Sequence, residues 1–455
     1  MTTLLQSDQQ SLSQQTQSWQ ERLQELFKHC HDLGASDAEV HLHLTTGFSV
    51  SVRRGQVDSI QQQNDQQLEL TVYRDQRKAT VSTTDLNPEG LKRLAQSACE
   101  IACYTEADPY AGLAEREQMA NLEEQSDLGI YNVWSISMEQ AIDKAIDLEK
   151  QALAYDERLS GEETALSTSQ EYYIYANSRG FCGFEPNTLH EMSCVLIACD
   201  DKGGKERDEA HSVSRHPDDL LSVETLAQMA AERTLSRLNS QRVTTLKTPV
   251  LFLPRVAQSI IGSFVSAISG GRLYRNASFL KDQIGELIFP EFISIKEKPH
   301  LPGGLGSSYF DNDGIATYEK AFIEQGRLNS YCLSVYSARR LDMSTTANAD
   351  GIHNLTVEQP NAPSYDELIK RMDRGLIVTE VMGHGVNLVT GDYSQGASGF
   401  WVENGVIQYA VSELTVAGHL KNMFQNIIAV GHDIDTQSNI QTGSILIDDI
   451  TIAGH

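Results

Sequence analysis

Two stretches near the start of this chain alternate apolar and polar residues with a period of two. They are residues 39–44 and 68–72, and their apolar members are Val40, Leu42, Leu44, Leu68, Leu70 and Val72. Such alternation is typical of β-strands with one covered face and one wet face. Arg54-Gly55 lies between the two runs and has the composition of a hairpin turn. The pattern therefore predicts a meandering sheet.

Helical patterns flank this predicted sheet on both sides. Between Trp19 and Leu33, apolar residues recur at helical spacing, and Gly34 follows as a stop. Asn87-Pro88-Glu89 places a proline in the first turn of a second helix, which we expect to run to about Tyr104. Residues 1–18 are rich in Gln and Ser and are expected to be a polar tail. Residues 19–104 are then an N-terminal α+β module.

The remaining sequence predicts two further modules. Ser137-Met-Glu-Gln140 resembles a capping box, and later strand and helix patterns extend to about residue 238, so residues 105–240 are expected to be a middle α/β module. Val250–Leu253 is a short apolar run that predicts a buried strand, and a helix should follow over Arg255–Ser269. Short β-like runs dominate the rest. The expected fold class is α+β, with N-terminal α/β modules followed by a large β-rich C-terminal domain, residues 241–455.

Composition narrows the class of protein. The chain has 455 residues, which suggests two or three domains, and its 36 Lys and Arg against 62 Asp and Glu give a formal charge of −26. An acidic chain argues against binding nucleic acid or an anionic membrane surface. The N-terminus has no basic or apolar signal segment, and the seven cysteines form no CxxC pair. We therefore expect a cytoplasmic protein with reduced thiols.

Three short motifs suggest a metal site, and each has a simpler explanation. His190-Glu191 is followed by a run with strand character, where residues four apart lie about 13 Å from each other, too far to share a zinc ion. Asp311-Asn-Asp313-Gly314 resembles the start of a calcium loop, but Phe322 occupies the position of the required acid, so we expect a turn. Cys99 and Cys103 are expected to be buried, reduced and free of metal.

Two glycine-rich segments near the C-terminus are the best candidates for binding. They are residues 382–385 and 391–399, and no GK[ST] sequence follows the first, so it is not a phosphate loop. Glycines there can serve tight turns in a packed β structure, or a loop that contacts a peptide or a partner protein. The candidate peptide- or partner-binding residues are His384, Asp392, Ser394, Gly396 and Gly399.

In this same region the chain resembles the TldD/PmbA family. The resemblance rests on Gly375–Asn387, Thr390–Gly405, Val411–Gly418 and Asn426–Asp433, with Ala349–Asn354 in addition. It extends more loosely to Gly55–Ser59 and Ser178–Gly180, so it covers nearly the whole chain after about residue 35. The combined pattern is specific, whereas none of its pieces is specific alone.

The resemblance also implies which half of the family this chain is similar to. In the TldD half, a helix after a strand carries HExxxH, and a late cysteine completes a zinc site. The matching positions here are Gln258, Ser259 and Ser263. No cysteine follows Cys332, and Thr436–Thr442 occupies the region of the late cysteine. Amides and hydroxyls are poor zinc ligands, and serine cannot replace glutamate in activating a metal-bound water. The chain therefore resembles the zinc-free PmbA (TldE) type, with no catalytic residue and no metal of its own.

The resemblance implies a non-catalytic subunit that pairs with a TldD-like chain, which would carry the zinc. Together they would mature peptides and degrade unfolded ones. Two alternatives stay open. A self-sufficient hydrolase would use another site, for which His384 with Ser394 or Ser398 is the best candidate. A homodimeric peptide-binding or regulatory protein would need no peptidase partner. We also expect a homodimer when the TldD-like partner is missing.

Overall fold

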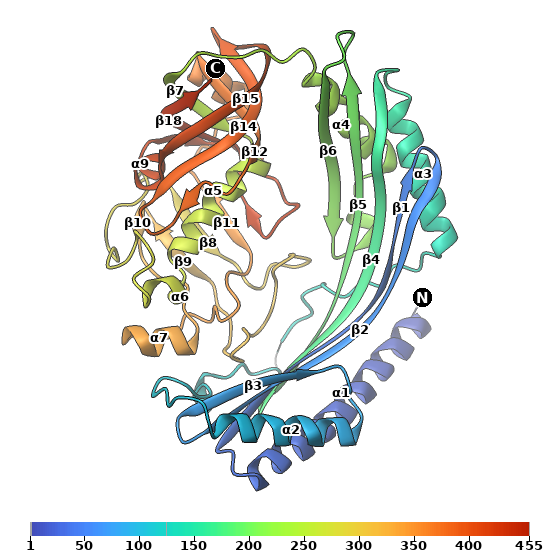
Figure 1. Ribbon diagram of the computed structural model, residues 1–455, viewed down its shortest axis with the longest axis vertical. Helices are drawn as coiled ribbons and strands as arrows, with labels where there is room; N and C mark the ends of the chain where they lie inside the picture. Colours follow the sequence, from blue (N-terminus) through green and yellow to red (C-terminus); the bar gives the residue numbers. More distant parts are fainter. Residues whose placement is uncertain (1, 124, 455) are drawn as a thin grey trace.

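The structure is a computed structural model that describes residues 2–123 and 125–454. Figure 1 shows a C-terminal domain, coloured yellow to red, facing one long curved sheet, coloured blue to green. Helices α1 and α2 lie at the base of the molecule, and α3 and α4 lie along the outer side of the sheet. Within the described residues, no helix is long and apolar enough to cross a membrane.

The curved sheet has six strands in the order β3-β2-β1-β4-β5-β6. Every neighbouring pair is antiparallel. The bounds are β1 Asp37–Arg53, β2 Gln56–Arg74, β3 Arg77–Thr83, β4 Leu159–Asn177, β5 Cys182–Cys199 and β6 Lys205–Ser214. Arg54 and Gly55 form the predicted turn between β1 and β2, and both have a positive φ. Their backbone N–H groups donate to the buried carboxylate of Glu149 on α3, which fixes this end of the sheet.

Four helices cover one face of this sheet. They are α1 Thr2–Asp32, α2 Pro88–Ala102, α3 Met138–Leu153 and α4 Val223–Ser236, with short 3₁₀ turns at Arg116–Gln118 and Pro217–Asp219. Val40 and Leu42 of β1 pack against α1 and α2, whereas Val50 and Val52 pack with α3 and α4. All four have even numbers, so one face of β1 supplies both cores.

The opposite face of the sheet meets the C-terminal domain. His41 of β1 contacts the hydroxyl of Tyr173 on β4 through Nδ1 at 2.8 Å, and that hydroxyl donates to Asn312 Oδ1 at 2.8 Å. Tyr173 also stacks on Phe310. The alternating pattern predicted that this face of the sheet would be exposed to solvent. It is partly covered by loops of the C-terminal domain, around residues 310–312.

The C-terminal domain contains a barrel. Its strands are β7 Leu246–Phe252, β12 Gly375–Met382, β14 Asp392–Glu403, β15 Val406–His419 and β18 Ile445–Ala453. β12 pairs in parallel with β7 and antiparallel with β14, so the order β12-β7-β18-β15-β14 closes on itself. Two short strands extend this sheet, β13 Val386–Asn387 and β16 Ile427–Val430.

A five-stranded sheet and five helices complete the C-terminal domain. The strand order is β10-β9-β8-β11-β17. The strands are β8 Ser294–Glu297, β9 Lys320–Glu324, β10 Arg327–Leu328, β11 Leu355–Glu358 and β17 Ile440–Gln441. The helices are α5 Pro254–Ala267, α6 Gly270–Leu273, α7 Val335–Leu341, α8 Tyr365–Met372 and α9 Leu420–Gln425. One large apolar core joins α5 and α9 to the barrel and to this sheet. The α+β class with a β-rich C-terminal domain is confirmed.

The N-terminal segment differs from its prediction. Residues 1–18 were expected to be a polar tail, yet α1 already begins at Thr2. The segment contains no proline or glycine before Gly34, and glutamine and leucine are good helix formers, so a polar composition does not prevent a helix.

The predicted module boundaries fall at different kinds of position. The boundary at residue 240 lies between α4 and β7, where the chain passes from the curved sheet to the barrel. The boundary at residue 104 follows α2, but strands on either side of it belong to the same six-stranded sheet.

Candidate functional site

The predicted strand–helix unit of the C-terminal domain is confirmed. β7 is followed directly by α5, with Pro254 in its first turn. The apolar residues of α5 face the core, and Val256, Ala257, Ile260, Ile261 and Phe264 are all buried. Gln258, Ser259 and Ser263 therefore lie on the remaining, polar side of the helix.

That polar side faces the late segment of the chain. A side chain added at Gly262 would meet Ile440 of β17 first, at 3.8 Å. Residues 436–442 are the stretch in which the resemblance places a cysteine ligand. The structure thus brings together the two segments that would have to meet in a zinc site.

Zinc does not fit the side chains present there. Ser259 Oγ donates to the Val256 carbonyl at 2.7 Å, and Ser263 Oγ donates to the Ser259 carbonyl at 2.9 Å, so both hydroxyls bond to their own helix. Gln258 Nε2 is buried and has no hydrogen-bond partner among the described residues. Within residues 2–123 and 125–454, no three His, Cys, Asp or Glu side chains are placed to hold a metal ion. An amide and two hydroxyls are not the imidazole, thiolate and carboxylate groups that zinc prefers.

The glycine-rich segment 391–399 is a strand for most of its length, not a loop. Gly396 and Gly399 lie in β14 and pair with β12. A Cβ at Gly399 would lie 1.7 Å from the Ile377 carbonyl oxygen, so glycine is required for the close approach of the two strands. The ladder between β14 and β15 is irregular at the same place, between Ala397 and Gly399. Close strand packing in the barrel therefore explains Gly399, whereas a Cβ at Gly396 would meet the Met382 side chain first.

The structure places the other candidate binding residues on one exposed hairpin. His384 lies in the connection between β12 and β13, and Asp392 and Ser394 begin β14. The Ser394 N–H donates to the Gly385 carbonyl at 2.7 Å, so the two segments lie side by side. Ser398 is buried. Among the described residues, no hydrogen bond joins His384 to Ser394 or Ser398, so the geometry offers no nucleophile–base pair.

The motifs that suggested metal sites have structural roles. His190-Glu191 lies in β5, as predicted, and the buried His190 ring contacts Thr168 Oγ1 and the Asn132 carbonyl. Asp311 forms the predicted turn, because its Oδ1 accepts from the backbone N–H groups of Asp313 and Ile315.

The prediction for the cysteine pair is half wrong. Cys99 is buried, but Cys103 is exposed, since it caps the C-terminus of α2. Its Sγ lies 3.3 Å from Arg74 Nη1.

An ionic network that the sequence did not reveal joins the curved sheet to the barrel. Asp208 of β6 is buried and accepts from Arg255 of α5 at 2.8 and 3.0 Å. Arg237, which follows α4, contacts Asp208 at 3.4 Å and Glu380 of β12 at 2.6 Å. Burial alone would raise the pKa of Asp208, but the hydrogen bonds and charge of Arg255 outweigh it and hold that pKa below its ordinary value. The network therefore fixes α5 against the curved sheet.

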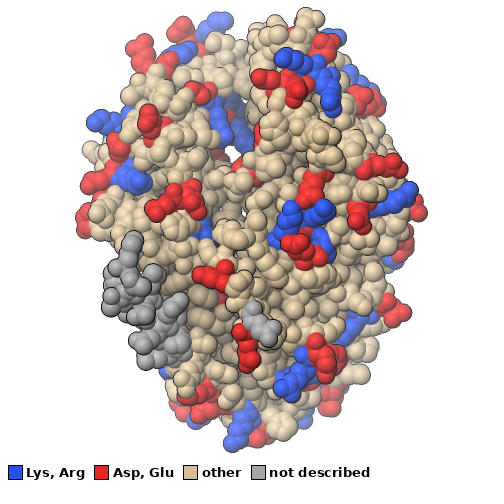
Figure 2. Space-filling model, turned by 180° about the vertical axis from the view of Figure 1, so that it is seen from behind, with Lys and Arg blue, Asp and Glu red and all other residues tan. Residues whose placement is uncertain are grey.

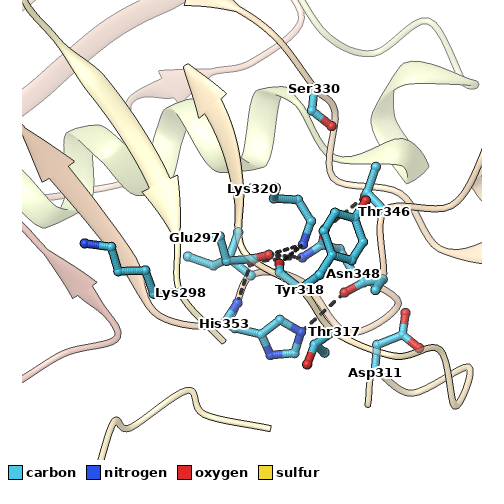
Figure 3. A network of polar contacts seen from close by, with 12 residues as sticks. Glu297, Lys298, Asp311, Thr317, Tyr318, Lys320, Ser330, Thr346, Asn348 and His353 are labelled. Atoms are coloured by element: carbon cyan, nitrogen blue, oxygen red, sulfur yellow. Dashed lines mark hydrogen bonds and ion pairs between the residues drawn. The ribbon is translucent and has the colours of Figure 1, made fainter. Parts of the chain in front are cut away.

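A second buried network lies inside the C-terminal domain (Figure 3). Glu297 of β8 is fully buried and pairs with Lys320 of β9. Its Oε1 also accepts from Asn348 Nδ2 at 3.0 Å and from the His353 N–H at 2.8 Å. These bonds anchor residues 348–353, part of one stretch that carries the family resemblance. A charge at the inward position after Ile293 and Ile295 is the sequence signal that could have located this network.

A buried carboxyl group, Asp311, and a partly buried one, Asp313, lie at the contact between the curved sheet and the C-terminal domain. Burial, together with the charge of Asp313, raises the pKa of Asp311 to about 8. Burial likewise raises the pKa of Asp313 to about 6. Asp313 Oδ2 accepts from the Val335 N–H at 2.7 Å, and the residue lines a polar hollow with His41, His43 and Glu69.

The architecture of a curved sheet beside a barrel, with α5 between them, defines a class of three-domain proteins. Models of the PmbA/TldA metallopeptidase domains match it in chain order: domain 1 over residues 38–102, the central domain over 131–238 and the C-terminal domain over 245–454. The chain therefore belongs to the TldD/PmbA family of metallopeptidases.

Individual relatives support this assignment. The chain is 43% identical to Metalloprotease PmbA of Escherichia coli O157:H7, covering 92% of this chain and 93% of that protein. It is 41% identical to a Metalloprotease PmbA homolog of Haemophilus influenzae, with 93% of each covered. The crystal structure of TldE from Thermococcus kodakarensis has the same fold, with a TM-score of 0.84 at 20% identity, covering 95% of this chain and all of that one, 100%.

Proposed function

We propose that this chain is the zinc-free subunit of a two-subunit metallopeptidase and acts with a TldD-like chain that carries the zinc. The pair would mature peptides and degrade unfolded ones in the cytoplasm. The observation that carries the proposal is the polar side of α5. It lies beside residues 436–442, in the arrangement that a zinc site of this family would need, yet it presents Gln258, Ser259 and Ser263.

The state of the two serines strengthens the proposal. Both hydroxyls are already used by backbone carbonyls of α5, so neither is held ready to activate a water molecule. The rest of the unit is intact, including the buried apolar face of the helix and the network around Asp208. A strand–helix unit that keeps its packing but lacks zinc-coordinating side chains is consistent with a role in structure or in guiding the substrate.

An open strand edge supports association with another chain. β3 pairs only with residues 68–74 of β2, and among the described residues no strand pairs with the outer edge of residues 56–67. This whole stretch is exposed, and Asp58 and Asp65 are its only charged residues. Natural proteins usually protect such edges with charges, prolines or a cover. We propose that the TldD-like subunit covers this edge.

Zinc content tests the proposal. Elemental analysis of the purified chain, of the TldD-like chain and of their complex should give about one zinc per TldD-like chain and none for this chain. A stoichiometric zinc in this chain alone would refute the zinc-free assignment. The triple variant Gln258→His, Ser259→Glu, Ser263→His should gain zinc affinity, since α5 already has the required helical spacing. The control variant Ser266→His places a histidine one helical turn after Ser263, and it should not gain zinc affinity.

A further inference from the structure

A cavity lies between α4 and β6 on one side and the barrel on the other. Its volume is about 320 Å³, and its walls include Leu253 and Pro254 at the start of α5, together with residues 433–435 and Gln437. Figure 2 shows the hollow between the two halves of the molecule, with basic side chains set inside it. The arginines that line the cavity are Arg233, Arg237 and Arg255.

Two of these arginines are already paired. Arg255 donates through Nη1 and Nη2 to Asp208, and through Nε to the Thr379 carbonyl at 2.6 Å. Arg237 contacts Asp208, Glu380 and Glu206. Neither guanidinium is free to bind an additional anion without breaking the network that holds the two halves together.

Arg233 differs from both. Its only hydrogen bond among the described residues is from Nη1 to the Glu209 carbonyl at 3.1 Å, and it forms no ion pair within 4 Å in that part of the chain. Burial, and then the charge of Arg255, lower the pKa of Arg233, while Asp208 and Asp435 act in the opposite direction. A guanidinium with five N–H donors has capacity left for a bidentate acceptor.

The acids of the cavity do not supply that acceptor. Asp433 accepts from the Ser444 N–H at 3.0 Å and from Ser444 Oγ at 2.6 Å, so both of its oxygens are used. Asp435 Oδ1 accepts from the Gln437 N–H at 2.9 Å. Asp433 is thus held by the segment that precedes β18, and Asp435 is held through one oxygen by a turn of its own loop.

The remaining walls of the cavity are mainly apolar, although His211, Ser236, Thr379 and Gln437 also line it. The apolar side chains are those of Leu221, Met229, Leu253, Pro254, Phe400 and Ile434. Ile434 is 45% exposed, so part of its apolar surface is open to a bound molecule. The cavity therefore offers one cationic anchor beside an apolar surface, at a size near the lower limit of small-molecule sites.

We propose that this cavity binds a carboxylate of a peptide through Arg233, with an adjacent apolar side chain covering Ile434. The inference rests on the proposed function, because it names the part of a peptide that this subunit would hold. A terminal carboxylate and an Asp or Glu side chain share the required chemistry. Bidentate arginine–carboxylate contacts provide geometric specificity that a single charge does not.

The test measures binding to the isolated chain, so it depends neither on zinc nor on a partner subunit. Fluorescein-labelled Ala-Ala-Ala-Leu is titrated as the free acid and as the C-terminal amide, together with Ala-Ala-Asp-Leu amide. We expect the free acid to bind at least about tenfold more tightly than the Leu amide, as a charge-assisted hydrogen bond requires. Equal binding of the Asp-containing amide and the free acid would show that the site accepts either kind of carboxylate, and tighter binding of the Asp-containing amide would assign it to side-chain carboxylates.

Arginine variants complete the test. Arg233→Gln should lose about tenfold in affinity for the free acid, and its affinity for the Leu amide should not change. Arg207→Gln is the control, since Arg207 is an exposed arginine of β6 that pairs with Glu162 on the surface. Thermal unfolding of each variant verifies that it is folded. Equal affinity for acid and amide, an unchanged affinity in Arg233→Gln, or no binding to the unaltered chain would overturn the proposal.

Discussion

Two glycines of the C-terminal domain differ in whether their surroundings leave space for a side chain. A Cβ at Gly399 would lie 1.7 Å from a backbone oxygen of β12, whereas a Cβ at Gly262 would find its nearest neighbour at 3.8 Å. Gly399→Ala should therefore cost roughly 1–3 kcal/mol or more of stability, because the backbone must move. Gly262→Ala should be neutral or stabilise by up to about 1 kcal/mol, since α5 gains helix propensity. Urea unfolding of both variants checks this, and equal losses would contradict it.

The partly buried carboxyl of Asp313 should give stability a defined pH dependence. Its pKa is raised to about 6 in the folded chain, above the ordinary value of 3.8. The folded state therefore holds the proton longer than the unfolded state, and this contribution to stability is lost as the pH rises from about 4 through 6. Asp313→Asn should flatten that part of the stability–pH curve, while its amide oxygen can still accept from Val335. Identical curves for both proteins between pH 4 and 7 would show that this carboxyl does not titrate there.

At the scale of elements, the open edge of β2 can be blocked without disturbing a core. Gln61→Lys with Gln63→Lys places two charges on the exposed stretch, and edge lysines oppose strand pairing. We expect this variant to bind the TldD-like chain at least about tenfold more weakly in sedimentation or pull-down experiments. Gln96→Lys with Gln228→Lys adds the same charge to exposed helical positions and should bind normally. Equal binding by both variants would place the interface elsewhere.

Local signals predicted most of the individual elements. The capping box at Ser137 and Gln140 is present, and Asn87 caps α2 with Pro88 in its first turn. The strand–helix unit of β7 and α5 was also predicted, because its apolar periodicity is strong. For the glycine-rich stretch of β14 the sequence left two interpretations open, tight turns in a packed β structure or a binding loop, and neither included a continuous strand. Gly399 is needed because β12 approaches it closely. This requirement comes from tertiary packing, and local residue propensities do not predict it.

At the scale of the whole molecule, the parts that escaped prediction are contacts between distant segments. Asp208 and Arg255 form an ion pair across the junction of the curved sheet and the barrel. The sequence around each residue does not indicate which residue it will pair with. The same holds for the single sheet shared by the first two modules, since period-two patterning identifies strands but not their neighbours. The candidate residues on α5 could be named from the family resemblance. The cavity at Arg233 could not be predicted, because its walls include parts of α4, β6 and the start of α5, which are distant in the sequence.

Reconstitution of peptidase activity decides whether this chain is the zinc-free half of a two-subunit enzyme. An unfolded peptide is incubated with the purified chain, with a TldD-like chain and with both together, each with and without a zinc chelator. We predict hydrolysis only in the mixture, abolished by the chelator and retained when Ser259→Ala and Ser263→Ala variants of this chain are used. Chelator-sensitive hydrolysis by this chain alone would contradict the account and identify it as an independent metallopeptidase.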